Sequence, residues 1–187
     1  MKKFILIFML SIAAQSHALE IADVILDEKI QLDKYQLMLN GAGVRNKFLV
    51  KAYVGSLYLA EKTHSADAVL ADTGAKRMSY TMLRDVTGRQ VLDRINEAIV
   101  ANNSIEEMKA LEKRFNMFEK IFSTVQEIKK GDIIYMDYIP GAGTRVSVNG
   151  AVMGHIEGVD FYQSLLKTWI GKKPIQASLK KNVLGEE

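Results

Sequence analysis

"LNGAGVRNKFLVKAYVGSLYL", the stretch Leu39–Leu59, opens with two closely spaced glycines and a single arginine and continues as a long apolar and aromatic run. From Phe48 onward both faces of an extended chain would be mostly apolar, which is typical of an interior strand covered on both sides of its sheet. The Asn40-Gly41 pair and the "GAGVR" motif favour a turn before this strand. Arg45 is therefore expected at the mouth of the most apolar strand of the protein.

Other segments carry strand patterns on both sides of this stretch. The segment 24–41 alternates loosely, and "KRMSYTML" places Met78, Tyr80 and Met82 on one face. Further along, "GDIIYMDYI", "TRVSV" and "AVMGHIEG" form three more expected strands. Pro140-Gly141 and Asn149-Gly150 separate them, and the second pair predicts a type I′ hairpin.

The middle and the end of the chain change to helical periodicity. Thr87 with Gln90 and Ser104 with Glu107 each form a capping box at the start of an expected helix. The second of these helices carries an apolar and aromatic stripe that we assign to the core: Met108, Leu111, Phe115, Phe118 and Phe122. Two C-terminal helices are expected over 160–170 and 177–184. Strands, then helices, then strands and helices again predict an α+β fold, with an antiparallel sheet and helices on one face.

The N-terminal segment 1–18 has the pattern of a signal peptide: two lysines, an apolar core too short to span a bilayer, and small residues before Leu19. We expect one mature domain over 19–187, located in the periplasm, and no later membrane span. The chain has no cysteine, so its core must hold the exported protein without disulfides. Removal of two lysines lowers the net charge from +3 to +1, which argues against nucleic acid as a partner.

Several kinds of chemistry have no support in the sequence. Beyond the signal segment the only histidines are His64 and His155, in different segments and without the spacing of metal ligands. Neither lies near a GxSxG nucleophile motif, and the chain has no GxGxxG or P-loop motif. We therefore expect no metal and no cofactor.

Arg45 is the main candidate for a ligand-binding residue. Its guanidinium stays charged and presents a fork that matches a carboxylate or a phenolate. Beside a strand that carries residues such as Tyr53 and Leu57, it would supply the anion anchor of an otherwise apolar pocket. A surface ion pair that merely braces a loop would explain the same residue, and spacing alone leaves both interpretations open.

The opening stretch, together with "LRDVTGRQVLDRINEAI" and "FYQSLLKTWIGKKPIQASLKKNVLG", resembles the chalcone isomerase-like family, and specifically its exported bacterial branch. The resemblance covers Tyr35 to Gly185. It implies an open-faced β-sandwich, in which a large antiparallel sheet carries a helical layer on one face.

In the plant enzymes of this family an arginine holds the phenolate that attacks in the cyclisation of a chalcone, and Arg45 matches it. The enzymes' threonine and tyrosine, which help to hold a water at the ketone, are matched by Ala52 and Val91. An asparagine is matched by Ala98, and a polar residue of the last helix by Thr168, which Trp169 follows. The resemblance thus keeps the arginine and one hydroxyl and replaces three polar groups with apolar ones.

This pattern is similar to that of the fatty-acid-binding members of the family, where the arginine meets a carboxylate. We expect a non-catalytic binding protein for a small amphipathic acid such as a fatty acid, with Arg45, Thr168, Tyr53 and Trp169 as ligand contacts and no assigned catalytic residue. The alternative is an intramolecular lyase of the chalcone isomerase type. A third possibility is a structural or interaction protein, and the oligomeric state stays open.

The signal segment makes the first testable prediction. N-terminal sequencing of the exported protein should give Leu19 as the first residue, because Ser16 and Ala18 are the small residues at the cleavage positions. Soluble protein that retains Met1 would contradict both the signal peptide and the periplasmic location.

Overall fold

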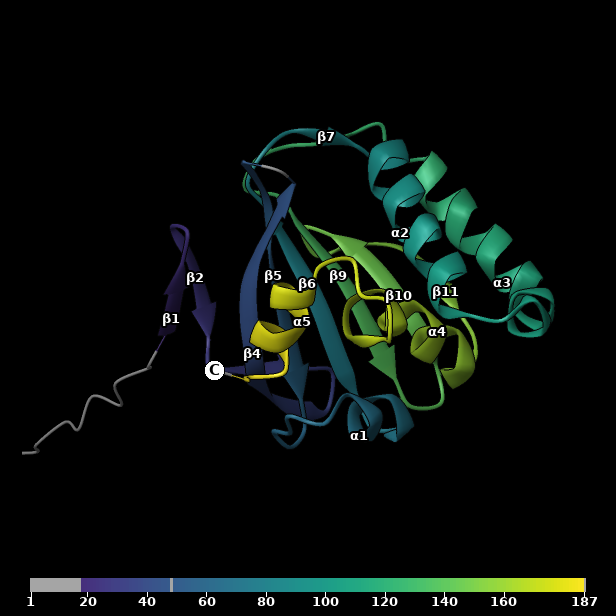
Figure 1. The fold of residues 1–187 in the computed structure, drawn as a ribbon, viewed down its shortest axis with the longest axis horizontal. Helices are drawn as coiled ribbons and strands as arrows, with labels where there is room; N and C mark the ends of the chain where they lie inside the picture. The colour runs from purple at the N-terminus through teal and green to yellow at the C-terminus, as the bar shows by residue number, and fades with distance from the viewer. Residues whose placement is uncertain (1–17, 48, 187) are drawn as a thin grey trace, which may run out of the picture.

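The computed structural model describes residues 18–47 and 49–186, so the predicted signal peptide lies outside it except for Ala18. The elements follow in the order β1 (Ala18–Ile21), β2 (Val24–Asp27), β3 (Lys29–Leu32), β4 (Tyr35–Lys47), β5 (Val50–Leu59), α1 (Ala66–Ala71), β6 (Lys76–Met82), β7 (Val86–Thr87), α2 (Gly88–Asn102), α3 (Ile105–Ser123), β8 (Glu127–Ile128), β9 (Ile133–Ile139), β10 (Gly143–Val148), β11 (Ala151–Ile156), α4 (Val159–Ile170) and α5 (Ala177–Val183). Seven strands form one antiparallel sheet in the order β11-β10-β9-β6-β5-β4-β3 (Figure 1). The α+β architecture with a large antiparallel sheet is confirmed.

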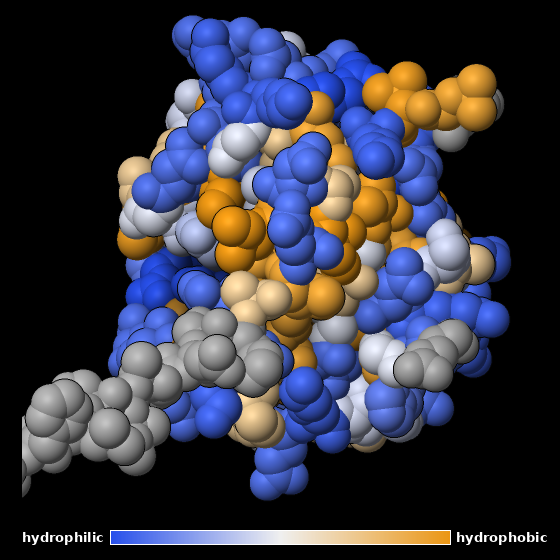
Figure 2. All heavy atoms as spheres, turned by 90° about the vertical axis from the view of Figure 1, so that its left-hand side faces the viewer, coloured by the Kyte–Doolittle hydropathy of each residue, from blue (hydrophilic) through white to orange (hydrophobic). Residues whose placement is uncertain are grey.

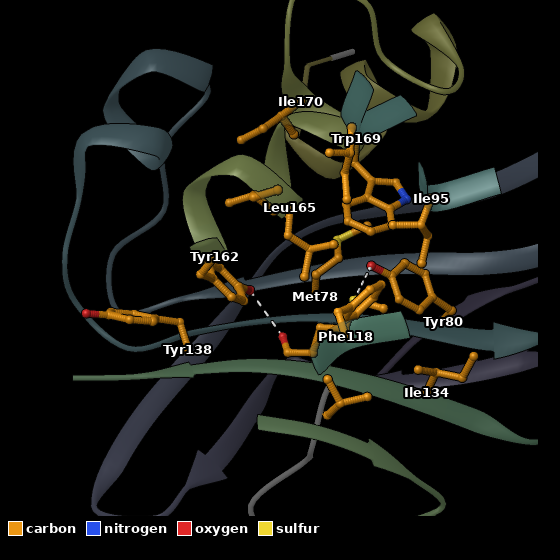
Figure 3. Packing of buried hydrophobic residues seen from close by; sticks show 14 of the residues in the cluster. Met78, Tyr80, Ile95, Phe118, Ile134, Tyr138, Tyr162, Leu165, Trp169 and Ile170 are labelled. Atoms are coloured by element: carbon orange, nitrogen blue, oxygen red, sulfur yellow. Dashed lines mark hydrogen bonds between the residues drawn. The ribbon is translucent and has the colours of Figure 1, made fainter. Parts of the chain in front are cut away.

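Helices cover one face of this sheet. α4 packs on β10, α5 lies along β4, and α2 packs on α4, while α3 lies against α2 and β11 (Figure 1). Between these layers lies the main core, in which Trp169, Phe118 and Phe161 are almost completely buried. The Tyr162 hydroxyl donates to the Met136 carbonyl across the two layers at 3.1 Å (Figure 3). Large aromatic side chains therefore hold the helical layer on the sheet.

The opposite face of the sheet has a smaller core. It consists of Leu26, Leu32, Leu37, Leu39, Val54, Tyr58, Ala75 and Ile139, against which parts of the β1–β2 hairpin pack. From the side on which β1, β2 and β4 lie, hydrophobic residues form a central strip framed by hydrophilic ones (Figure 2). No helix in the described residues belongs to this core, so the helical layer lies on the other face alone, as expected of the open-faced β-sandwich.

The apolar strand β5 supplies both cores. Leu57 and Leu59 point to the helices, whereas Val54 and Tyr58 point to the opposite face. β5 pairs with β4 on one side and β6 on the other. The predicted interior strand, covered on both faces, is therefore confirmed, and its alternation explains why both faces are apolar.

The turn predicted at Asn40-Gly41 is wrong. β4 continues through these residues to Lys47, with only a register shift between Leu39 and Gly41 in its pairing with β5. Instead, the glycines allow α5 to approach β4 closely. A Cβ at Gly41 would overlap the Asn182 carbonyl oxygen, and one at Gly43 would lie 2.6 Å from the Asn182 Cβ. "GAGVR" therefore lies under α5 rather than in a turn.

Asn40 also belongs to this contact. Its side-chain amide donates to the Val183 carbonyl at 2.9 Å, and its side-chain oxygen accepts from the Thr63 amide at 2.8 Å. An Asn-Gly pair thus anchors the C-terminal helix to the middle of a strand, because one residue supplies hydrogen bonds and the other supplies space.

The structure confirms the two predicted capping boxes, the predicted Asn149-Gly150 turn and the apolar stripe of α3. Both capping boxes are present, from Thr87 to Gln90 and from Ser104 to Glu107. Asn149 and Gly150 both have positive φ, at 50° and 82°, as a type I′ turn requires. The stripe on α3 faces the core with Leu111, Phe115, Phe118 and Phe122 buried, while Met108 is partly buried and packs against them.

An ion network crosses the face opposite the helices. Asp137 is fully buried and accepts from Arg77 through both carboxylate oxygens, at 2.5 and 2.8 Å. Arg145 donates to the same carboxylate at 3.2 Å and to Asp33 at 3.0 Å. The Arg77 guanidinium also lies 4.2 Å from the centre of the Tyr135 ring. The charges of these arginines are therefore satisfied within the fold.

The glycine contact makes the second prediction. Gly41→Ala should destabilise the protein by about 1–3 kcal/mol, because the added methyl group must push α5 away from β4. Chemical unfolding followed by circular dichroism measures the loss.

A glycine in open surroundings provides the control. Gly74→Ala, in the loop before β6, would meet only the Asp72 side chain, at 3.1 Å, and should change stability by less than about 1 kcal/mol. If Gly41→Ala unfolded at the same denaturant concentration as the native protein, the close contact between β4 and α5 would be refuted.

Candidate ligand-binding site

A cavity of about 280 Å³ opens between the sheet and the first half of α2. Its walls are mostly apolar and aromatic and come from β5, β6, β9, α2 and the end of α4: Tyr53, Tyr80, Met82, Ile95, Ile134 and Trp169. Figure 3 shows Tyr80, Ile95 and Trp169 gathered at one end of the core, with Ile134 on the sheet below them. The cavity is therefore a continuation of the main core that the helices leave uncovered.

Arg45 lies at the edge of this cavity, on the strand that α5 covers. It pairs with Tyr53 across the β4–β5 ladder, so both side chains leave the sheet on the helical side. Its Nη1 atom donates to the Gln176 side-chain oxygen at 3.0 Å and to the Asn46 carbonyl. Within the described residues no carboxylate lies at ion-pairing distance from Arg45.

Gln176 positions the arginine. It directly precedes α5, and its side chain bonds three points of β4: it accepts from Arg45 and from the Asn46 amide, at 2.8 Å, and donates to the Val44 carbonyl at 3.1 Å. These bonds use Nη1 of the guanidinium alone, and no hydrogen bond from Nε or Nη2 is found in the described part of the chain. The remaining donors of the fork are therefore available to an anion.

Tyr53 is the second polar group of the cavity. Its hydroxyl oxygen accepts from the Trp169 indole nitrogen at 3.1 Å, which leaves its own proton to donate. Its ring meets Tyr80 edge to face at 5.2 Å, and Tyr80 in turn packs on Trp169 at 5.0 Å. Burial raises the pKa of the Tyr53 hydroxyl to about 12, although the Trp169 hydrogen bond and the Arg45 charge both lower it. At neutral pH this group is a neutral hydrogen-bond donor and no base.

Further charges line the mouth of the cavity. Lys47 and Arg84 are exposed and have no ion-pair partner among the residues described. The acidic residues at the rim are both neutralised: Asp93 pairs with Arg89 at 2.8 Å and Glu97 pairs with Arg94 at 2.7 Å. The entrance is thus biased towards anions.

The sequence-predicted contacts divide into two groups. Arg45, Tyr53 and Trp169 meet at the cavity. Thr168 does not line it: the residue is completely buried, and its hydroxyl has no hydrogen-bond partner in the described structure. Because neighbouring residues of a helix point about 100° apart, the cavity that receives Trp169 is out of reach of Thr168.

Of the three positions at which the family resemblance implies a lost polar group, two line the cavity and one does not. Ala52 and Val91 both line the cavity, where neither side chain can donate or accept a hydrogen bond. Ala98 is buried two helical turns further along α2 and is not part of the lining.

Sequence reasoning missed Gln176, Tyr80 and Arg84. Gln176 lies in a basic segment near the C-terminus, and only its contact with β4 reveals its role. Tyr80 had been placed on an apolar strand face without a function. Arg84 lies in a loop, within the stretch 83–99 that carries the family resemblance, but the resemblance gives it no role. No signal of spacing could have found these three residues, since Tyr80 and Arg84 line the cavity, and Gln176 holds Arg45, only through tertiary contacts.

The described residues contain no group of three or more His, Cys, Asp or Glu side chains that could hold a metal ion. They also contain no helix long and apolar enough to cross a membrane. What the cavity offers is the guanidinium fork of Arg45, the phenolic donor of Tyr53 and an aromatic wall. This arrangement can bind the acid group of an amphipathic molecule.

Comparison with known proteins agrees with the architecture. The fold is similar to that of an Arabidopsis thaliana fatty-acid binding protein, with a TM-score of 0.66 and 15% sequence identity over 90% of this chain and 96% of that one. Among curated proteins no sequence match is found. The profile described as chalcone isomerase-like matches residues 18–185. The chain therefore belongs to the chalcone isomerase-like family.

Proposed function

We propose that this protein is a non-catalytic, periplasmic binding protein for a small amphipathic acid such as a fatty acid, held through Arg45. The observation that carries the proposal is the guanidinium of Arg45, which lines an apolar cavity without a carboxylate partner in the described residues. A charged group without a counter-ion beside an apolar wall matches a ligand that brings both the anion and the apolar tail.

The head group would meet two donors. The free side of the Arg45 fork would bind the carboxylate, and the Tyr53 hydroxyl would donate to the same group, because its oxygen is already occupied by Trp169. The tail would lie over Tyr80 and under Ile95 of α2. Burial raises the pKa of the Tyr53 hydroxyl to about 12, so this donor stays neutral around neutral pH while the ligand carboxylate is ionised.

The size of the cavity limits the ligand. At about 280 Å³ it falls near the lower end of the roughly 300–1,000 Å³ typical of small-molecule sites. It suits a single acyl chain rather than a lipid with two chains. Binding of fatty acids by the Arabidopsis protein of the same fold supports this choice of ligand class.

The alternative is a lyase that closes a chalcone ring. Such a reaction needs hydrogen bonds to the oxygen on which negative charge develops. Ala52 and Val91 lie in the cavity at two positions where the family resemblance implies polar groups, and they supply none. This observation favours binding over catalysis.

The third possibility, a structural role for Arg45, rests on its bond to Gln176. That bond ties β4 to the start of α5 but involves only Nη1 of the guanidinium. If Arg45 is a structural brace, Arg45→Ala should lower stability, whereas if it is a ligand anchor, the substitution should lower ligand affinity.

Arg45→Ala should weaken fatty-acid binding by about ten- to a hundredfold, because a hydrogen bond to a charged group contributes roughly 1.5–3 kcal/mol. Arg45→Lys should recover only part of the affinity, since an ammonium lacks the planar fork. Displacement of a fluorescent fatty acid measures both effects.

Two further variants separate the explanations. Arg114→Ala removes an arginine that pairs with Asp160 and does not line the cavity, so it should bind normally. Gln176→Ala removes the tether and leaves the guanidinium, so its affinity should fall less than that of Arg45→Ala. If Arg45→Ala binds normally and unfolds far earlier, Arg45 is a brace and the proposed site fails.

For catalysis we expect no cyclisation of a hydroxychalcone above the spontaneous rate. Loss of one donor to a developing oxyanion already costs about a hundredfold or more in rate. Absorbance of the chalcone, followed with and without protein, provides the measurement. Turnover that Arg45→Ala abolishes would show that the lyase alternative is right.

A further inference from the structure

The tip of the β4–β5 hairpin exposes two adjacent large apolar side chains. Leu49 is 101% exposed and Val50 is 50% exposed. The other large hydrophobic residues exposed in the described chain are isolated in sequence: Leu19, Ile25, Val100, Ile105, Met117 and Val152. Single exposed apolar residues are ordinary, whereas a pair at the end of a projecting hairpin needs an explanation.

Cations surround this tip. Lys47 and Lys51 flank it in sequence, and both are exposed. Arg84 comes to the same end of the sheet because the Leu83 amide donates to the Ala52 carbonyl at 3.0 Å, which ties the loop after β6 to β5. Apolar and cationic groups therefore occur together there.

Lys130 adds a fourth positive charge to this end. Its amide donates to the Asp85 carboxylate at 2.8 Å, in the loop that carries Arg84. Asp132, another acid of this region, accepts hydrogen bonds from the Lys129 amide and the Asn149 side chain. In the part of the chain that the structure describes, none of the four cations takes part in an ion pair. The four cations outnumber the carboxylates of Asp85 and Asp132, so the excess charge at this end is positive.

We infer that this end of the sheet docks on a lipid surface with anionic head groups, with Leu49 and Val50 entering the interface. A bilayer surface satisfies both features, since its acyl boundary accepts the apolar tip and its head groups neutralise the cations. Each lysine or arginine close to such a surface strengthens binding by about fivefold. A protein partner would need a matching acidic groove, which nothing in the structure calls for.

Docking in this orientation bears on the cavity. Lys47 and Arg84 belong both to the four cations at this end of the sheet and to the mouth of the cavity. The mouth would therefore open towards the lipid surface, where an amphipathic acid partitions. This consequence rests on the proposed function, whereas docking itself does not.

Co-sedimentation with vesicles tests the docking. The purified protein should bind vesicles of phosphatidylcholine and phosphatidylglycerol in equal parts, bind phosphatidylcholine alone far less, and be released from the anionic vesicles by high salt. Leu49→Ser/Val50→Ser should lower the vesicle affinity by at least tenfold. Lys51→Gln should lower it about fivefold on anionic vesicles only.

The matched control is Val100→Ser/Ile105→Ser, which replaces two isolated apolar residues of comparable exposure near the α2–α3 junction and should leave vesicle binding unchanged. Circular dichroism verifies that all variants fold. The inference is overturned if the native protein binds neither vesicle, or if the tip variant binds as well as the native protein. A partner protein that needs the tip, without vesicle binding, would likewise overturn it.

The two proposals fail separately. The vesicle assay contains no free acid, so its failure leaves acid binding intact. Leu49→Ser/Val50→Ser should retain normal fatty-acid affinity in the displacement assay, because neither residue lines the cavity.

Discussion

The close approach of α5 to β4 at Gly41 and Gly43 is the constraint on which the rest of the site depends. Without a Cβ at these positions, the C-terminal helix lies directly on the strand backbone. Asn40 fixes one end of the helix through the Val183 carbonyl, and Gln176 fixes the other end beside Arg45. The N-terminal end of α5 therefore lies beside Arg45, and the cavity opens next to this end of the helix.

The arginines on the two faces of the sheet have different hydrogen-bond partners. On the open face, Arg77 and Arg145 surround the buried Asp137, so their charges hold strands together. On the helical face, Arg45 has a neutral amide as its partner and no acid in the described residues. A neutral partner orients a guanidinium without cancelling its charge. The same residue type thus serves stability on one face and remains available for a ligand on the other.

The chemistry of the cavity suits recognition. The Tyr53 hydroxyl keeps its proton far above neutral pH, because burial raises its pKa to about 12. Tyr53 and Arg45 thus place two hydrogen-bond donors beside an aromatic wall, and Ala52 and Val91 add no polar group to that wall.

The sequence by itself determined strands β5, β6 and β9–β11, the capped helices, the aromatic stripe of α3 and the prominence of Arg45, because these depend on periodicity and local hydrogen bonds. It did not show that β4 continues through Asn40-Gly41. Tyr53 and Trp169 could be proposed from the apolar pattern and the family resemblance. The place of Gly41 under α5, the role of Gln176 and the exclusion of Thr168 were decided only by the tertiary structure. The first two depend on which segments meet across more than a hundred residues, and the spacing of residues along a chain carries no record of such a contact.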